Sequence, residues 1–236
     1  MRRLFDDELN DLDTSFTEMG MLVSEAIGKA VTSFVNHDRA LAQEVIDHDH
    51  LINDREVQLE KKSFEMIALY QPVTTDLREI VTILKAVSDL ERMGDYARSV
   101  AHSTIRVKGN KRVASIEQHV SEMGTIVQQM VADVLAAYVK EEGVRAKEIA
   151  KTDARAADYY QLIYMESIDQ MRQDPEVVIG TTDYLAVAQY LKRIGDYVTN
   201  ICEWIVYLQT GKIVELNPRN DHQQAEAETN KPTNNE

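Results

Sequence analysis

Four oxygen-bearing side chains are spaced one helical turn apart in two separate segments, Asp49 with Asn53 and Glu91 with Asp95. Residues four positions apart lie on the same face of a helix, so each pair would present its oxygens together. Oxygen ligands at this spacing suit Mg²⁺, Mn²⁺ or iron ions. The pairs therefore predict a cation site between two helices that face each other.

Both pairs continue stripes of apolar residues. The stripe that precedes Glu91 and Asp95, in steps of three and four, consists of Leu77, Ile80, Leu84 and Val87. The stripe on which Asp49 lies consists of Leu41, Val45 and Ile52. A charge in such a position needs a cation or strong hydrogen-bond donors, because burying a bare charge is costly. The alternative, which is commoner on helices, is a solvated acidic face or ion pairs with Lys and Arg.

A glycine directly precedes the aspartate in two matching motifs, Gly94-Asp95 and Gly195-Asp196. Glycine within a helix costs about 1 kcal/mol relative to alanine. Its presence there indicates close approach by another helix or by a ligand.

Other candidate chemistry is weaker. His48 and His50 lie about 200° apart on a helix and cannot serve one ion, so we interpret them as a surface cluster. The sequence has no Glu-x-x-His, no glycine-rich phosphate-binding motif, and no Ser or Cys nucleophile in a recognisable setting. The sequence therefore favours a protein that is not an enzyme.

The composition restricts the function further. The 236 residues include 26 Lys and Arg against 40 Asp and Glu, a net charge of −14. Such acidity argues against binding to nucleic acids or to a bare anionic membrane. The single cysteine, Cys202, excludes a disulfide framework within the chain, and no apolar stretch is long enough to span a membrane. We expect a soluble cytoplasmic protein.

The elements that must position these residues are helices. The chain has only nine glycines and four prolines, and its apolar residues recur at helical spacing. The periodicity predicts six long helices, at 3–36, 38–69, 74–107, 115–141, 143–172 and 182–211. Short turns between long helices predict an elongated antiparallel bundle.

The two halves of the chain repeat. Glu18-Met19-Gly20 returns as Glu122-Met123-Gly124, and Asp49 matches Asp153, both at an offset of 104 residues. Arg92-Met93-Gly94-Asp95-Tyr96 returns as Arg193-Ile194-Gly195-Asp196-Tyr197 at an offset of 101. The sequence therefore predicts an all-α protein of two tandem antiparallel three-helix bundles, residues 1–110 and 111–216. The polar segment 217–236 is predicted to be a disordered tail.

Several separated segments resemble the PhoU family of accessory regulators of bacterial phosphate uptake. They are ALYQP at 68–72 with DLR at 76–78, DLERMGD at 89–95, and NICEW at 200–204 with YLQTG at 207–211. The resemblance covers roughly residues 5–212. It implies two similar three-helix bundles and a negative regulatory role, exerted through contacts with the phosphate ABC transporter ATPase and the phosphate-sensing histidine kinase. It also implies homodimers and metal clusters of iron or zinc.

In this family the metal ligands come from Glu/Asp-x-x-x-Asp motifs on the second and third helices of each bundle. Glu91 and Asp95 match one motif intact, and Asp49 matches the first position of the other. Asn53 stands where the family usually has Asp, which keeps an oxygen ligand but removes a charge.

The second bundle departs further from the pattern. Asp153 and Asp196 remain, but Ala157 and Lys192 replace the two other acids. Because the Lys192 ammonium would repel a cation and can neutralise Asp153 or Asp196, we expect a salt-bridged core there instead of a metal cluster. Two other functions stay open at this point: a carboxylate-bridged metalloenzyme of the bundle type, and a helical adaptor or co-chaperone unrelated to phosphate.

Overall fold

The computed structural model describes residues 2–107 and 111–216, and within them the chain is helical with no strand. The elements are α1 (Arg2–Val35), α2 (Arg39–Tyr70), α3 (Thr74–Arg106), α4 (Ala114–Val139), α5 (Gly143–Gln173), a 3₁₀ turn η1 (Pro175–Val177) and α6 (Val178–Thr210). The predicted disordered tail 217–236 lies outside the described residues. So do residues 108–110, next to the predicted boundary between the bundles.

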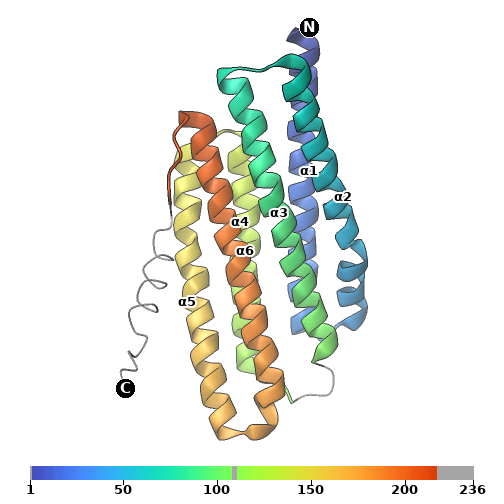
Figure 1. Cartoon of the computed structure of the whole chain (residues 1–236). Helices are drawn as coiled ribbons and strands as arrows, with labels where there is room; N and C mark the ends of the chain where they lie inside the picture. Colours follow the sequence, from blue (N-terminus) through green and yellow to red (C-terminus); the bar gives the residue numbers. More distant parts are fainter. Residues whose placement is uncertain (1, 108–110, 217–236) are drawn as a thin grey trace, which may run out of the picture.

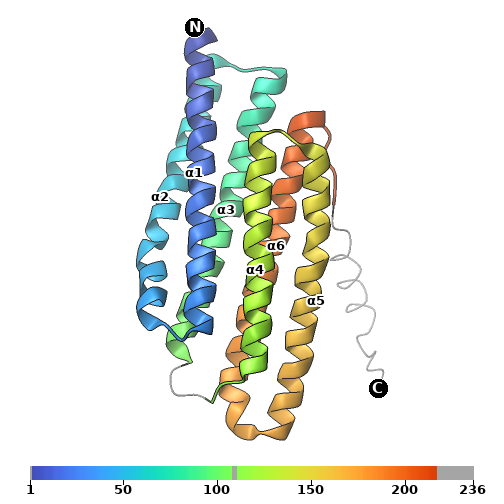
Figure 2. The same cartoon turned by 180° about the vertical axis from the view of Figure 1, so that it is seen from behind.

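The helices form two antiparallel three-helix bundles, α1–α3 and α4–α6, as predicted (Figure 1). The bundles lie side by side, with α3 packed on α6 across one face and α1 packed on α4 across the other (Figure 2). One continuous apolar core extends through both bundles. Asn200 of α6 also donates a hydrogen bond to Asp89 of α3 over 3.2 Å. The two repeats are therefore halves of one packed unit.

Local signals account for the helix ends. The carboxylate of Asp38 accepts a hydrogen bond from Leu41 N at 3.0 Å and caps α2. Asp174 caps the turn that begins at Pro175, as its sequence position indicates. This turn continues directly into α6, which therefore begins at Val178, four residues before the predicted start at 182.

Glycines allow close contact between α1 and α4. A Cβ on Gly124 of α4 would lie 2.6 Å from a methyl carbon of Val31 on α1, and one on Gly20 would lie 2.3 Å from Leu135 Cδ2. These glycines belong to the repeated Glu-Met-Gly motif, and Val31 and Leu135 are themselves 104 residues apart. The contact is therefore reciprocal, with each bundle supplying one glycine and one branched side chain.

Candidate functional site

Asp49 lies in the interior, between Val45 and Ile52 on the buried face of α2, and is only 7% exposed. Arg98 of α3 neutralises it, with Nη1 3.2 Å from Asp49 Oδ2. The same guanidinium donates through Nη2 to Asp95 Oδ1 at 2.9 Å. One arginine thus bridges the two aspartates that the sequence predicts to face each other across α2 and α3.

The other two predicted ligands lie beside this bridge. Asn53 Nδ2 donates a hydrogen bond to Asp49 Oδ2 at 3.4 Å, so the amide already uses its nitrogen on the carboxylate. Glu91 sits at the rim, with its side chain 19% exposed and 3.9 Å from Arg92. Burial, together with the nearby charges of Asp95 and Glu56, raises the pKa of Glu91 to about 7.

Two members of the cluster were not predicted from the sequence, Arg98 and Glu56. Glu56 accepts a hydrogen bond from Ser88 at 3.1 Å, and burial raises its pKa. Both residues follow the predicted ligands at helical spacing, since Glu56 is seven residues after Asp49 and Arg98 is seven after Glu91. Extending each polar stripe by one more step would have found them.

The donor types fit a hard cation, because the cluster combines carboxylates with an amide oxygen. As placed, however, no three Asp, Glu, His or Cys side chains converge in metal-binding geometry anywhere in the described ranges. The guanidinium of Arg98 holds the position between Asp49 and Asp95 that a cation would need. A metal ion would therefore bind to this set only after Arg98 moves away. His48 and His50 are both exposed, in agreement with their interpretation as surface residues.

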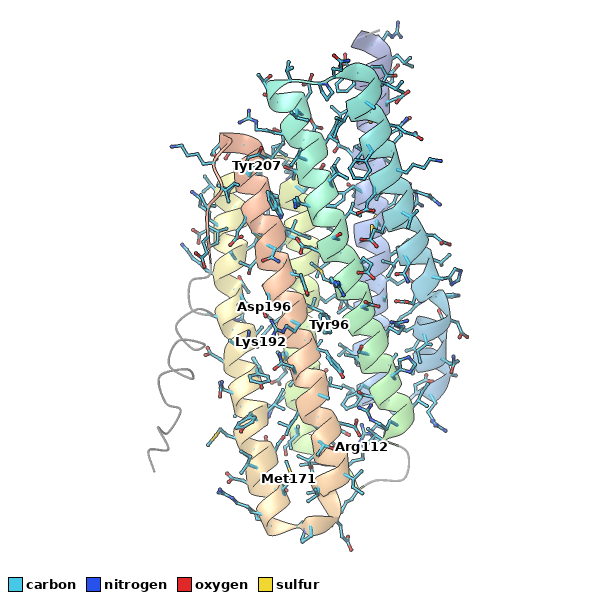
Figure 3. The ribbon with its side chains drawn as sticks, viewed as in Figure 1. Tyr96, Arg112, Met171, Lys192, Asp196 and Tyr207 are labelled. Carbon is cyan, nitrogen blue, oxygen red and sulfur yellow. The ribbon has the colours of Figure 1, made fainter. Side chains whose placement is uncertain are left out.

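The second bundle has the salt bridge that its sequence predicts. Lys192 Nζ lies 3.1 Å from Asp196 Oδ1, and Arg193 Nη1 lies 3.5 Å from Asp196 Oδ2. Figure 3 shows Lys192 and Asp196 on α6, close to Tyr96 of α3. Asp153 is buried on the facing helix α5, 3% exposed.

The two motif glycines admit side chains of a facing helix. A Cβ on Gly195 would lie 2.5 Å from Asp153 Oδ1, and one on Gly94 would lie 3.0 Å from Ile52 Cδ1. The close approach predicted from the sequence is therefore made by a neighbouring helix in both bundles. In the second bundle the missing side chain leaves room for a buried carboxylate.

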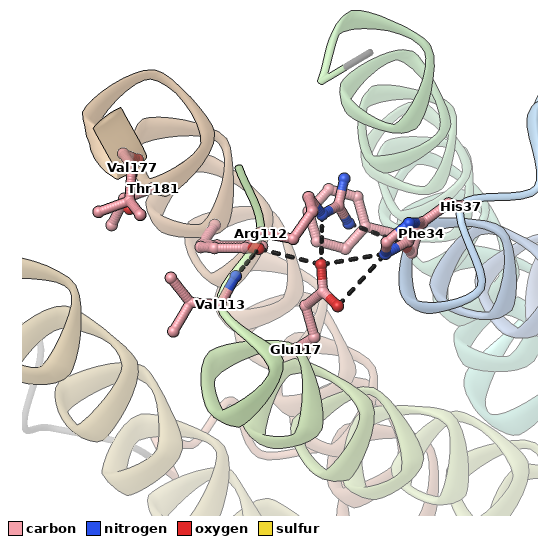
Figure 4. A network of polar contacts seen from close by, with 8 residues as sticks. Phe34, His37, Arg112, Val113, Glu117, Val177 and Thr181 are labelled. Carbon is pink, nitrogen blue, oxygen red and sulfur yellow. Dashed lines mark hydrogen bonds and ion pairs between the residues drawn. The ribbon is translucent and has the colours of Figure 1, made fainter. Parts of the chain in front are cut away.

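A further polar cluster joins the two bundles near the linker (Figure 4). Glu117 of α4 pairs with Arg112, accepts from the Tyr184 hydroxyl of α6 at 2.9 Å, and lies 3.2 Å from His37 Nε2. Arg112 also donates to the carbonyl oxygen of Phe34 at the end of α1 and lies over its ring, 5.1 Å from the centroid. This Glu117 cluster thus ties α1, α4 and α6 together. Its contacts were not predicted from the sequence.

The comparison with known families follows the same division into halves. The PhoU domain model matches residues 16–104 and again residues 120–205, one match in each bundle. The chain belongs to the PhoU family. The resemblance seen in the sequence is thereby confirmed.

Relatives in the PhoU family match along nearly the whole folded body. The chain is 36% identical to phosphate-specific transport system accessory protein PhoU homologues from Streptococcus pneumoniae and Clostridium acetobutylicum, over 92% of this chain and 100% and 99% of theirs. The crystal structure of the phosphate transport system regulatory protein PhoU from S. pneumoniae superposes with a TM-score of 0.85 at 35% identity, covering 90% of this chain and all of that one. PhoU from Pseudomonas aeruginosa superposes with a TM-score of 0.82 at 32% identity, covering 88% of this chain and all of that one.

Across the described ranges, no helix is both long and apolar enough to cross a membrane. The PhoU relatives are named as accessory or regulatory proteins of phosphate transport. An accessory role in phosphate transport is thus the function shared by this chain's relatives.

Proposed function

We propose that this protein is a negative regulator of phosphate uptake and of the phosphate-starvation response. The observation that carries the proposal is the PhoU match in both bundles, together with relatives named as accessory proteins of phosphate-specific transport. Its partners in this role are the ATPase subunit of the phosphate ABC transporter and the phosphate-sensing histidine kinase. Regulation then takes place in the cytoplasm, and the protein acts as a homodimer.

The proposed mechanism is protein contact. A regulator that works by contact must bind two states of its partner with different affinity, since only differential binding shifts an equilibrium. The net charge of −14 favours encounter with basic surfaces. Binding to either partner should therefore weaken as salt is raised, because about 0.1 M salt screens exposed charges over about 10 Å.

The carboxylate cluster of the first bundle supports a second part of the proposal, a regulatory cation site. Asp49, Glu91 and Asp95, with the amide oxygen of Asn53, would hold a divalent cation or an iron or zinc ion in place of the Arg98 guanidinium. A bound cation would supply positive charge between α2 and α3 and would have no catalytic role. The second bundle, where Lys192 already pairs with Asp196, would bind metal weakly or not at all.

Three strains with a reporter of the phosphate-starvation response test the regulatory role: intact, deleted, and truncated after Leu216. Deletion should raise expression in phosphate-replete cells, and the truncated protein should behave as the intact one, since both PhoU matches end before that residue. Unchanged expression in a deletion strain that also lacks any second PhoU copy would contradict the proposal. If the protein instead copurified with a chaperone ATPase and with neither phosphate partner, it would be a general helical adaptor.

A further inference from the structure

A groove runs along the contact between α1 and α4, the helices in front in Figure 2. The apolar part of the groove has a volume of about 410 Å³. In it Met21 of α1 faces Ala132, Ala136 and Val139 of α4. Met21 is 64% exposed and Val139 is 62% exposed. Two large apolar side chains thus stand open to solvent in a groove between two helices, on a chain that is otherwise strongly acidic.

At one end the groove opens into an acidic part of about 500 Å³. The two parts are continuous, because Thr17, Met21 and Val139 line both. The carboxylates that line the acidic part are Asp13, Glu18, Glu79 and Glu141. Among the described residues that line the two parts, Lys140 is the one basic side chain, and it lines the apolar part.

Three of these carboxylates have no cationic partner within the part of the chain that the structure describes. Among the described residues, Asp13, Glu79 and Glu141 form no ion pair; Glu18 pairs with Arg55 at 3.3 Å. Asp13 instead accepts the hydroxyl hydrogen of the buried Tyr138 and hydrogen-bonds Glu79. Burial, together with the hydrogen bond to Asp13 and the nearby charges of Asp13, Glu141 and Asp76, raises the pKa of Glu79 to about 8. The proton that Glu79 holds relieves part of the repulsion with Asp13, and a basic side chain entering this end would supply the positive charge that no described Lys or Arg gives these three carboxylates.

We propose that this groove binds one amphipathic helix of a partner protein, with its apolar stripe on Met21, Ala136 and Val139 and its basic residues at the acidic end. Paired helices present a furrow in which the ridge of a third helix packs, and apolar anchors supply most of the binding energy in such grooves. The charge at one end sets the direction in which the helix lies. The inference goes beyond the proposed regulatory role, because it concerns recognition of a basic helix whether or not phosphate is involved.

A second copy of this chain is the less favoured occupant. It would bring the same net charge of −14 against this face. Like charges oppose such a contact at low salt, whereas a basic helix is attracted by the same field.

The test uses the full chain and a fluorescein-labelled synthetic helix of leucine and lysine with leucines on one face. Binding is followed by fluorescence anisotropy at low salt. Ala136→Arg places a bulky cation in the groove and should weaken binding, raising the dissociation constant about tenfold or more. Ala40→Arg is the matched control, because Ala40 is also exposed but lies on α2, and it should bind as the wild type does. A peptide with the same composition but no apolar face should bind much more weakly to wild type.

A charge-matched pair of variants separates groove binding from general attraction to an acidic protein. Glu18→Gln with Glu141→Gln removes two groove carboxylates, and Glu65→Gln with Glu176→Gln removes two exposed carboxylates elsewhere. The groove pair should weaken binding severalfold more than the other pair. Equal losses would overturn the proposal.

Two further outcomes would also overturn it. One is equal binding of the labelled helix to wild type and Ala136→Arg. The other is a wild-type dimer in sedimentation equilibrium that Ala136→Arg converts to monomer, because the groove would then belong to a second copy. If Ala136→Arg does not retain the helical circular dichroism of wild type, Ala132→Arg, also exposed on the groove, replaces it under the same criteria.

Discussion

Val31 of α1 places its branched side chain where Gly124 of α4 has none, so that a Cβ at position 124 would lie 2.6 Å from Val31 Cγ1. Gly20 and Leu135 repeat this contact with the helices exchanged. Tandem three-helix units need not share a core. These paired contacts let α1 and α4 approach closely enough to join the two cores into one.

Gly124→Ala should destabilise the protein by about 1–3 kcal/mol, because Val31 is stiff about χ1 and a core that is already packed resists an added methyl group. Gly28→Ala is the control on the neighbouring helix. Its Cβ would meet only the terminal amide of Gln128, the movable end of a flexible side chain, so the helix-propensity gain of up to about 1 kcal/mol should dominate. Urea unfolding followed by circular dichroism measures both. Similar effects of the two substitutions would refute a specific contact at Gly124.

Arg98→Gln should open the cation site in the first bundle. Without metal the substitution should lower the free energy of unfolding by about 1–2 kcal/mol, because the buried Asp49 loses its ion pair. The loss is limited because the Arg98 side chain is partly exposed and water already screens the pair. With Mn²⁺ the variant should bind more tightly than wild type in isothermal titration calorimetry. Arg92→Gln removes the same charge from a residue that contacts only Glu91 among the proposed ligands, and it should change binding less.

Adding Glu91→Ala to Arg98→Gln should abolish the Mn²⁺ affinity gained. Persistence of that affinity would mean that the ion binds elsewhere. If neither Arg98→Gln nor Arg92→Gln binds Mn²⁺ or Zn²⁺ in this experiment, the result would contradict the proposed cation site.

Glu79 makes stability depend on pH in a predictable direction. Its pKa is about 8 in the folded protein against an ordinary value of 4.5, so the folded state holds a proton that the unfolded state releases. The stabilisation from this proton is present below about pH 4.5 and is lost as pH rises toward 8. Glu79→Gln mimics the protonated form and should raise the melting temperature at pH 8.5 by about 2–4 °C or more, with little change at pH 5.

Glu65→Gln, which removes a carboxylate from a helix at an exposed position, is the control for the pH experiment. It should have the pH profile of wild type. Glu91 and Asp89, whose pKa values are raised to about 7 and about 6 chiefly by burial, contribute a similar fall to wild type and to both variants, so the difference between variants isolates Glu79. A difference between Glu79→Gln and wild type that does not grow with pH would disprove the assignment.

Glu117→Ala should destabilise the junction of the bundles by about 3–5 kcal/mol, because it leaves the half-buried Arg112 without its carboxylate and Tyr184 without an acceptor. The double substitution of Glu117 and Arg112 by alanine should destabilise the protein by less than the sum of the two single substitutions, since the two side chains act as a pair. The measurement is a double-mutant cycle by chemical denaturation. Additive effects would show that Glu117 and Arg112 do not interact energetically.

Sequence patterns alone determined the secondary structure and the internal symmetry. Apolar residues at helical spacing predicted all six helices to within a few residues at nearly every end, because the period of a helix is a local property. The repeated Glu-Met-Gly and Gly-Asp-Tyr motifs predicted the two bundles. The position of Asp49 on an apolar stripe predicted its burial, and the same reasoning placed Glu91 and Asp95 either inward or at the rim.

Only the tertiary structure decided which partners these residues meet. Arg98 lies between Asp49 and Asp95 because α2 and α3 pack in one register, and no local pattern states that register. The Glu117 cluster joins residues 67 to 80 positions apart, and the contact of Val31 with Gly124 spans 93 positions. Such contacts depend on how whole helices pack on one another. The periodicity of each helix shows which face is buried but not which side chain of another helix lies against it.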